Sequence, residues 1–431
     1  MKGFVALVVL AVWGVGTAAS MEDILASARK AKKPGEVRVP AGTYYIEKTL
    51  TLGPDDSGLR FVADGEVTIS GGREVSGWRL HEPGVWVADV PWVTPSNSVR
   101  LLTVNGMPRM LARSPNRPKA GCYHVAWGGG GKRLDYAPGA FDPSWQDVEN
   151  GEVTLYHFWT DTHCRLKKVL TNHVEFVSPA RKGFGTGVRN NEPGANNAWY
   201  LIENLYPLMD EPGEWCVDEK RAKIYYRALP GEDPTNVRIV VPAVETLVEI
   251  AGRPAEDGRW ATDISFEGFR FADAAYTLPF SDVNDAQASE KVGAAVRLSG
   301  SRRCVFRNCR FENLSAYAFH FGKGTSACAL EGSRLSWLGA GGVRLCGARD
   351  EISPFESCRG NRIVGCTIEH YGRRYLSGVG VLVQHASGTF VKGCRIHDGF
   401  YTGVSLGWSW GYRHSVARDN VIEGNEISLI G

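Results

Sequence analysis

The chain has 431 residues, enough for two or three structural units, and 43% of them are hydrophobic. Its 49 basic and 47 acidic residues give a formal net charge of +2, which offers no electrostatic argument for a nucleic-acid partner. The 51 glycines and 13 tryptophans favour short strands, many turns and flat stacking surfaces.

Residues 1–20 have the pattern of a secretory signal peptide. Lys2 supplies a positive charge, an apolar stretch runs from Phe4 to Val15, and small residues follow at 17–20. This stretch is too short to cross a bilayer as a helix, and no later run approaches spanning length. We therefore expect cleavage near Ala19 or Ser20, no membrane span, and a secreted protein, either periplasmic or extracellular.

Residues 21–77 predict a capping helix followed by the first coils of a solenoid. The segment 21–36 is amphipathic, with Ile24, Leu25 and Ala28 on one face and a Pro-Gly pair at its end. Short alternating runs bounded by Gly and Asp turns then predict strands. A solenoid needs such a cap because its first coil would otherwise expose unpaired backbone.

Residues 78–243 show hairpin chemistry, including an Asn-Gly turn at 105–106, and predict an inserted antiparallel β-sandwich. Within them, His157, Asp161 and His163 could suggest a metal site. We expect them to be scattered surface polar residues, as such residues of a sandwich insertion more often are. The sequence thus predicts no metal and no cofactor.

Residues 244–431 repeat one sequence pattern, in which a Gly turn separates two runs of alternating apolar residues. This pattern predicts an all-β solenoid in which equivalent side chains of stacked coils line up. One predicted column of aligned positions comprises Phe269, Cys309, Ser333, Cys366, Cys394 and Asn425. The cysteines of this column are expected to be buried free thiols, not disulfides.

Three groups of phrases carry a family resemblance. They are PAGTYYIEKTLTL with GEVTISGG, the insertion phrases NGMPRMLARSPN and NNAWYLIENLYPLMDEPGEWCVDEKRAKIYY, and HDGFYTGVSLGWSWG. Together they resemble the right-handed parallel β-helix glycosidases of glycoside hydrolase family 141 and, more distantly, of family 120, over most of residues 22–431. The resemblance implies a right-handed parallel β-helix with a sandwich insertion, and an exported enzyme acting on α-fucosides or xylan-type linkages.

The chain departs from this family at its C-terminal end. In the relatives, the coil ending in Gly-Trp-x-Trp-Gly precedes further coils that carry the candidate catalytic carboxylates. This sequence stops at Gly431, about one coil after Trp410 and without a polar cap. We expect a C-terminal truncation, in which case the family's catalytic pair lies beyond residue 431. A complete protein with a short solenoid is the alternative.

Glu369 and Asp398 form the best candidate catalytic pair within the sequence. Glycoside hydrolysis uses two carboxylates, and aligned turns place these two as diagonal neighbours beside His370 and His397, which are candidate substrate-binding residues. The structural alternative is that Asp398 caps a turn while Glu369 pairs with Arg373 or Arg395.

Two further features predict saccharide contacts. In the second strand of each coil, His320 and Arg344 belong to an outward-pointing column with Arg297, Leu382 and Ser405. Trp408 and Trp410 stand in a Gly-rich turn, where exposed rings could pack on a sugar. An ordinary solvated face, and tryptophans packed on the side of a coil, are the competing interpretations.

The predicted function is hydrolysis of a polysaccharide or oligosaccharide by paired carboxylates. A polysaccharide lyase is the first alternative, although the outward column lacks an acidic cluster for Ca²⁺. A non-catalytic carbohydrate-binding or adhesion solenoid is the second.

Overall fold

The computed structural model describes residues 19–31, 35–116, 123–181, 198–279, 281–350, 353 and 355–431. Residues 1–18 of the predicted signal peptide lie outside them. The chain divides into two compact units, each described separately below. Unit 1 comprises the residues up to Gly72, Pro242–Ala275 and Gly293–Gly431, and unit 2 comprises Arg73–Val241 and Tyr276–Val292. Unit 2 takes in most of the predicted insertion and also a return segment, 276–292, that the pattern did not indicate.

Unit 1 begins with the predicted capping helix, α1 (Met21–Lys30). Ser20 and Asp23 form a reciprocal capping box at its start, which satisfies backbone N–H groups that the helix itself cannot pair. Ile24, Leu25 and Ala28 are buried as predicted, and they pack into the core of unit 1. No helix in the described part of the chain is long and apolar enough to cross a membrane.

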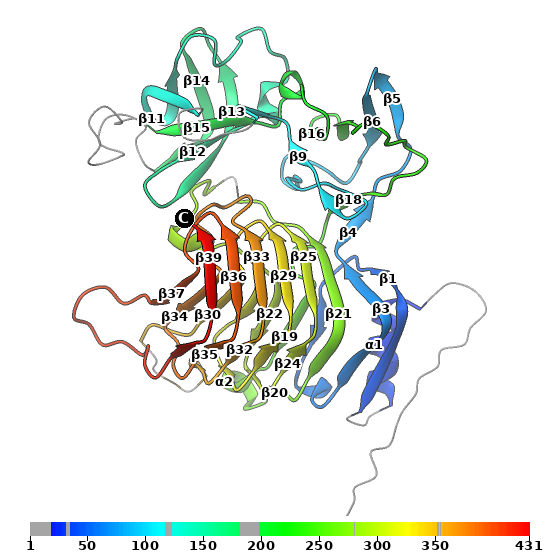
Figure 1. Ribbon diagram of the computed structural model, residues 1–431, viewed down its shortest axis with the longest axis vertical. Helices are drawn as coiled ribbons and strands as arrows, with labels where there is room; N and C mark the ends of the chain where they lie inside the picture. Colours follow the sequence, from blue (N-terminus) through cyan, green and yellow to red (C-terminus); the bar gives the residue numbers. More distant parts are fainter. Residues whose placement is uncertain are drawn as a thin grey trace, which may run out of the picture. The chain divides into compact units, whose positions relative to one another are not determined.

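The longest sheet of unit 1 has two halves that meet on β21 (Ser265–Ala274) (Figure 1). One half stacks β24 (Val305–Arg307), β28 (Ala329–Glu331), β32 (Arg362–Val364), β35 (Phe390–Lys392) and β38 (Val421–Glu423). The other stacks β25 (Arg310–Leu314), β29 (Arg334–Leu338), β33 (Thr367–Tyr371), β36 (Arg395–Gly399) and β39 (Glu426–Ile430). On its other side β21 pairs with β3 (Arg60–Ser70), which pairs with β1 (Glu36–Tyr45).

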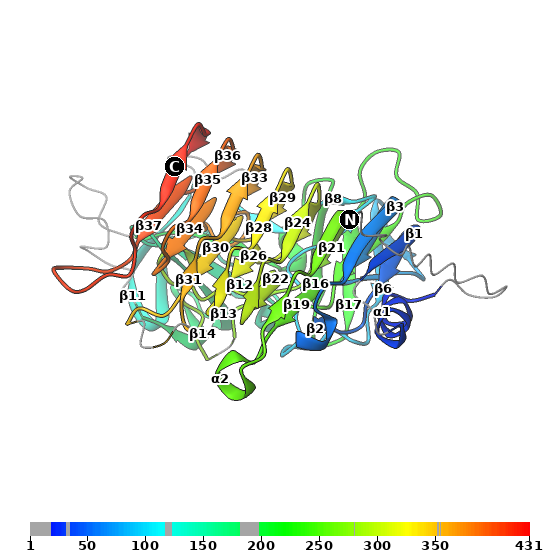
Figure 2. The ribbon, with the colours of Figure 1, turned by 90° about the horizontal axis from the view of Figure 1, so that it is seen from below.

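Two further sheets are built from other strands of the coils, and the larger can be followed by its labels in Figure 2. The larger runs through β2 (Leu50–Leu52), β19 (Val248–Ala251), β22 (Ala294–Ser299), β26 (Tyr317–Phe321), β30 (Val343–Cys346), β34 (Val381–Gln384) and β37 (Val404–Gly407). The smaller contains β20 (Ala261–Thr262), β23 (Ser301–Arg302), β27 (Thr325–Ser326) and β31 (Cys358–Arg359), and α2 (Pro254–Asp257) and η1 (Pro54–Asp56) lie outside the sheets. Val381 pairs with Val404 in parallel register, so the predicted stacking of coils is confirmed.

Left-handed backbone recurs at the same corners of successive coils. One column with φ between 52° and 81° contains Gly268, Asn308, Gly332, Gly365, Gly393 and Gly424. A second, with φ between 52° and 59°, contains Asp273, Asn313, Trp337, His370, Asp398 and Leu429. Gly, Asn and Asp adopt this conformation at lower cost than other residues, which explains their recurrence in the sequence. The second column matters for function because it contains His370 and Asp398.

The core of unit 1 is built from stacked equivalent side chains. The Phe266 ring lies 4.7 Å from the Phe61 ring and 5.1 Å from the Phe306 ring, centroid to centroid, and both pairs are stacked. In the cysteine column, the Cys309 amide donates to Ser333 Oγ at 3.1 Å and the Cys394 amide donates to Asn425 Oδ1 at 2.8 Å. Nine cysteines are free among the described residues, and they include Cys309, Cys366 and Cys394 of the predicted column; Cys122 lies outside the described residues.

Unit 2 is built mainly from antiparallel strands. Its six-stranded sheet contains β10 (Arg113–Ser114), β15 (Trp199–Glu203), β11 (His124–Tyr136), β14 (His173–Ala180), β13 (Asp161–Val169) and β12 (Glu152–Tyr156), and an additional β12–β15 pairing closes five of these strands on themselves. Its five-stranded sheet contains β5 (Arg79–Glu82), β6 (Val85–Asp89), β17 (Lys223–Arg227), β16 (Glu214–Asp218) and β9 (Met110–Leu111). Short 3-10 turns are η2 (Val148–Asn150), η3 (Tyr206–Leu208) and η4 (Gln287–Ser289).

A four-stranded sheet contains β4 (Gly72–Glu74), β18 (Ile239–Pro242), β7 (Thr103–Val104) and β8 (Met107–Pro108). Asn105 and Gly106 join β7 to β8 with φ of 51° and 78°, which is the turn predicted for the Asn-Gly pair.

Candidate functional site

Side chains of β33 and β36 point alternately into and out of the core, and four predicted site residues come together on the outside of unit 1. They are Glu369, His370, His397 and Asp398. Ile368 and Tyr371 point into the core, while Glu369 lies between Ile368 and the left-handed corner at His370. Parallel register pairs Glu369 with His397 on the next coil. Asp398, one residue further along β36, comes beside His370, so the predicted clustering is observed.

Glu369 is held by the side chains of Arg334 and His397. Its Oε1 accepts a hydrogen bond from Arg334 Nε at 2.6 Å and lies 2.5 Å from Arg334 Nη2. Its Oε2 lies 3.1 Å from His397 Nε2. The side chain is 8% exposed, so these contacts fix its carboxylate just under the surface.

Asp398 is more open and is held from one side. Arg373 Nη2 lies 2.6 Å from Asp398 Oδ2, and His370 Nδ1 contacts the same oxygen. Partial burial acts to raise the pKa of Asp398, but the hydrogen bonds from Arg373 and His370 outweigh it and hold the pKa below its ordinary value. The side chain is 41% exposed, so an ionised carboxylate oxygen is accessible to a ligand.

These ion pairs differ from the structural alternative considered from sequence. Arg373 pairs with Asp398 and not with Glu369, and Arg395 pairs with Glu426 at 3.4 Å. The pairing of Glu369 with either arginine is therefore wrong. The physical reason is the corner at residue 370, which turns the chain so that Arg373 reaches the neighbouring coil.

Aromatic rings border the cluster, and sequence reasoning did not select them. The Trp337 ring lies 4.5 Å from the His370 ring in the same left-handed column. Arg373 Cζ lies 5.7 Å from the Trp337 ring centroid and 4.9 Å from that of Phe400. Phe400 is 49% exposed, so it offers an apolar face beside the carboxylates. Trp337 could have been selected from sequence, because the aligned repeat places it in the same column as His370 and Asp398.

The outward column on the second sheet is present but does not form an open groove. Arg297, His320 and Arg344 are in register on adjacent coils, followed by Leu382 and Ser405. However, Arg344 is only 9% exposed and Leu382 is fully buried. Burial and the neighbouring Arg344 and Arg297 hold the pKa of His320 well below its ordinary value, so this imidazole is neutral. The expectation of an exposed polar stripe is therefore wrong in its middle section, because other residues cover the column there.

Trp408 and Trp410 form an edge-to-face pair, with ring centroids 5.2 Å apart. Trp408 Nε1 donates to Ser405 Oγ at 3.1 Å, which anchors the first ring. Trp410 is 61% exposed and Tyr412 is fully exposed. The ring of Trp410 is therefore exposed, and its contact with a saccharide stays a prediction.

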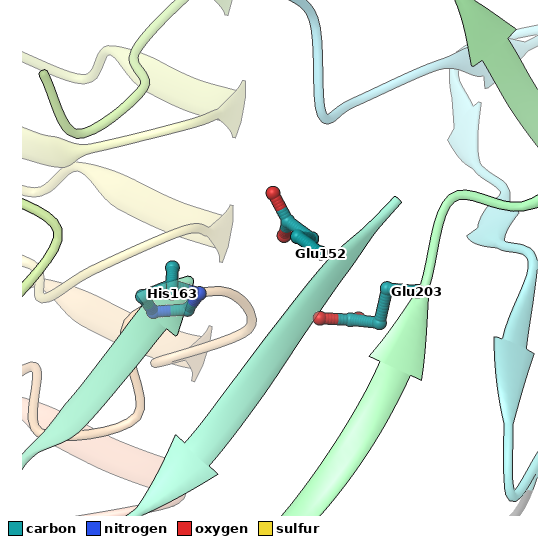
Figure 3. A group of neighbouring side chains, drawn as sticks. All are labelled: Glu152, His163 and Glu203. Carbon is teal, nitrogen blue, oxygen red and sulfur yellow. The ribbon is translucent and has the colours of Figure 1, made fainter. Parts of the chain in front are cut away.

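A buried polar cluster on unit 2 was not predicted (Figure 3). Glu152, His163 and Glu203 come from the neighbouring strands β12, β13 and β15, and one potential ligand atom from each lies within 4.8 Å of the others. The expectation that His157, His163 and their neighbours are surface polar residues is wrong, because these two histidines are 6% and 5% exposed. The first four residues of β12 and the first four of β13 are all buried, so alternation along these strands does not bring their polar residues to solvent.

The atoms of this cluster that could bind a metal already take part in a hydrogen-bonded network. Thr154 Oγ1 donates to Glu203 Oε2 at 2.5 Å, and Arg100 Nε donates to Glu152 Oε2 at 2.9 Å. His163 lies 3.2 Å from Thr154 Oγ1 through Nδ1 and 3.2 Å from Asp161 Oδ1 through Nε2. A mixed set of two carboxylates and an imidazole can hold Zn²⁺ or Mn²⁺, but here a cation would have to replace the His163 contacts. The geometry is that of a structural ion-pair network.

Comparison with known proteins identifies the fold. The model of the right-handed β-helix region matches residues 293–431. No curated protein sequence matches the chain. A solved structure described as a glycoside hydrolase is similar with a TM-score of 0.82 and 19% identity, over 95% of this chain and 82% of that one.

Two other solved structures are less similar. A complex of XylC with xylose has a TM-score of 0.47 and 13% identity, over 95% of this chain and 60% of that one. An alginate lyase from Paenibacillus sp. str. FPU-7 has a TM-score of 0.30 and 13% identity, over 41% of this chain and 51% of that one. The matching β-helix model, the structure with a TM-score of 0.82 and the parallel sheets described above together establish a right-handed parallel β-helix.

Proposed function

We propose that this protein is a secreted carbohydrate-active enzyme that hydrolyses glycosidic bonds in a polysaccharide or oligosaccharide. The observation that carries the proposal is the cluster of Glu369, His370, His397 and Asp398 on the outside of the β-helix, with an accessible ionised carboxylate at its centre. The likeness in fold to a structure described as a glycoside hydrolase supports it.

The roles follow from exposure and charge. Asp398 is ionised and accessible, which suits a nucleophile or a general base. Glu369 is the second carboxylate on the adjacent coil, and coils lie about 4.8 Å apart, within reach of the roughly 5–9.5 Å separations that glycosidases use. His370 and His397 would orient these groups, and Phe400 would pack against a sugar ring.

The substrate class rests on the sequence resemblance to glycoside hydrolase family 141. We propose α-fucosides or xylan-type linkages as the first substrates to test. The full chain should release nitrophenol from a nitrophenyl α-L-fucoside or β-D-xyloside, and Asp398→Asn and Glu369→Gln should each lower kcat/KM at least about 100-fold, as loss of acid–base catalysis does.

Asp419→Asn is the matched control, because Asp419 is an 82% exposed carboxylate of the same unit at another corner. Its kcat/KM should equal that of the wild type. A fully active Asp398→Asn would refute the site, and a wild-type chain without hydrolysis of any fucoside, xyloside or xylan would refute the enzymatic proposal.

A second candidate is non-catalytic saccharide binding at the same surface. The specific observation in its favour is that both carboxylates are already ion-paired, Glu369 with Arg334 and Asp398 with Arg373. Paired carboxylates can accept hydrogen bonds from sugar hydroxyls without transferring protons. Binding of xylan or a fucosylated oligosaccharide without turnover would select this function.

A further inference from the structure

Unit 2 contains a pocket of about 390 Å³ whose walls all belong to that unit. Its walls are supplied by β5, η3, β16 and β17 and by the loop before η2. The volume falls within the range of about 300–1,000 Å³ that is usual for small-molecule sites. It is separate from the Glu152, His163 and Glu203 cluster, none of which lines it.

One wall of this pocket is aromatic. The rings of His81, Tyr206 and Tyr225 meet edge to face, with centroids 5.0 to 5.7 Å apart. Trp145 adds a fourth ring, which is held against Phe141 at 6.1 Å. Burial and nearby Glu82 raise the pKa of the Tyr206 phenol, a group that can both donate and accept hydrogen bonds. Such rings combine apolar faces with polar edges.

The pocket also holds a fixed charged group. Arg221 Nη1 bonds Asp147 Oδ2 at 2.8 Å and Asp218 Oδ2 at 2.6 Å. Asp218 is itself fixed, because its Oδ1 accepts from Asn150 Nδ2 at 3.1 Å and from the Arg221 amide at 3.0 Å. The guanidinium is thus oriented before any ligand arrives, and 51% of the Arg221 side chain remains exposed. An oriented arginine beside an aspartate offers donors and acceptors to adjacent hydroxyl groups.

The local charge balance favours an uncharged ligand. Two carboxylates, Asp147 and Asp218, surround Arg221, and Lys220 Nζ approaches Asp147 at 3.8 Å. The two formal positive and two formal negative charges cancel. An anionic ligand would therefore compete with both aspartates for the guanidinium, whereas a polyol would use donors and acceptors together.

We propose that this pocket of unit 2 binds an uncharged sugar unit of a polysaccharide, as an accessory site distinct from the carboxylate cluster of unit 1. The choice of a saccharide rests on the proposed carbohydrate-active function. The ring would pack on the aromatic wall, and its hydroxyls would bond Arg221 and Asp147.

The test measures binding and not turnover. Xylotetraose, cellotetraose and trigalacturonate are titrated into the full chain by isothermal calorimetry, and saturation-transfer NMR identifies the bound sugar protons. We expect one of the neutral tetrasaccharides to bind, and Trp145→Ala and Asp147→Asn to weaken it at least tenfold and threefold, respectively. Asparagine is chosen at 147 because it tolerates the left-handed backbone found there, at φ 52°.

Trp127→Ala is the matched control, because Trp127 is a 63% exposed tryptophan of unit 2 that does not line the pocket. It should bind like the wild type. Preference for trigalacturonate, no binding of either neutral probe, or equal loss in Trp127→Ala would overturn the inference.

The outcome is separable from that of the proposed function. Asp398→Asn should lower kcat/KM for hydrolysis at least about 100-fold and leave this binding intact, while Trp145→Ala should weaken this binding and leave hydrolysis of a small nitrophenyl glycoside intact. Hydrolysis without binding in unit 2 overturns the inference alone. Binding in unit 2 without hydrolysis supports the inference and overturns the enzymatic proposal.

Discussion

Replacing Gly399 by alanine should break the stacking of two coils next to the carboxylate cluster. Gly399 of β36 pairs with Tyr371 of β33, and a Cβ at position 399 would lie 1.9 Å from Tyr371 Cζ and 2.2 Å from Cε2. The tyrosine is fully buried, so its ring has no free space to move into. Overpacking of a core costs about 1–3 kcal/mol, and this clash should reach about 3 kcal/mol. At about 2–4 °C per kcal/mol the melting temperature should fall by about 6–12 °C.

A double-mutant cycle read by calorimetric unfolding tests the cause of this loss. Tyr371→Ala alone should cost about 3–5 kcal/mol through the cavity that it leaves. In that background Gly399→Ala should cost almost nothing, because its clashing partner is gone. Gly393→Ala is the control: nothing lies within 4 Å of its Cβ, so only its φ of 62° should cost about 1–2 kcal/mol, with or without Tyr371. Additive costs for Gly399→Ala and Tyr371→Ala would refute the stacked register.

Three further outcomes are expected. Because Arg373 lowers the pKa of Asp398, that carboxylate contributes stability above its ordinary pKa of 3.8 and loses it as pH falls through the lowered value. Arg373→Ala should raise the pKa of Asp398 in carboxyl NMR titration, and the free energy of unfolding should then fall less as the pH is lowered. An unchanged pKa would contradict the ion pair. The nine described cysteines are free and almost all are buried, so iodoacetamide should label them slowly in the native protein and fully in denaturant. A disulfide-linked peptide among them in mass spectrometry would contradict the fold. Trp410→Ala should change the free energy of unfolding by less than about 0.5 kcal/mol, because the ring is 61% exposed, while weakening xylan binding in affinity electrophoresis; unchanged binding would remove it from the site.

The architecture of unit 1 could be predicted because its repeat carries the register. Every coil places an apolar side chain at the position of Phe311, Leu335, Ile368, Ile396 and Ile427, and these residues pair in that order. Once the repeat is aligned, the residues next to Glu369 and Asp398 on the adjacent coils can be predicted. The ion-pair partners of the two carboxylates cannot be predicted in this way, because they depend on long arginine side chains and on the corner at residue 370.

Unit 2 has no repeat from which a register could be inferred. Glu152 pairs with Glu203 across fifty residues of intervening chain, and such antiparallel pairing leaves no periodic trace in the sequence. The same applies to the pocket formed by η3, β17 and the loop before η2. The alternating pattern of the repeat also did not predict burial. Leu382 lies in an outward-facing position and is nevertheless fully buried.

The position of a bound substrate tests the central claim most directly. A crystal structure of Asp398→Asn with a bound xylo-oligosaccharide or fucoside should place a sugar ring against Phe400, within hydrogen-bond distance of residue 398 and next to Glu369 on β33. A ligand found only in unit 2, or on a face of the β-helix away from β33 and β36, would contradict the account.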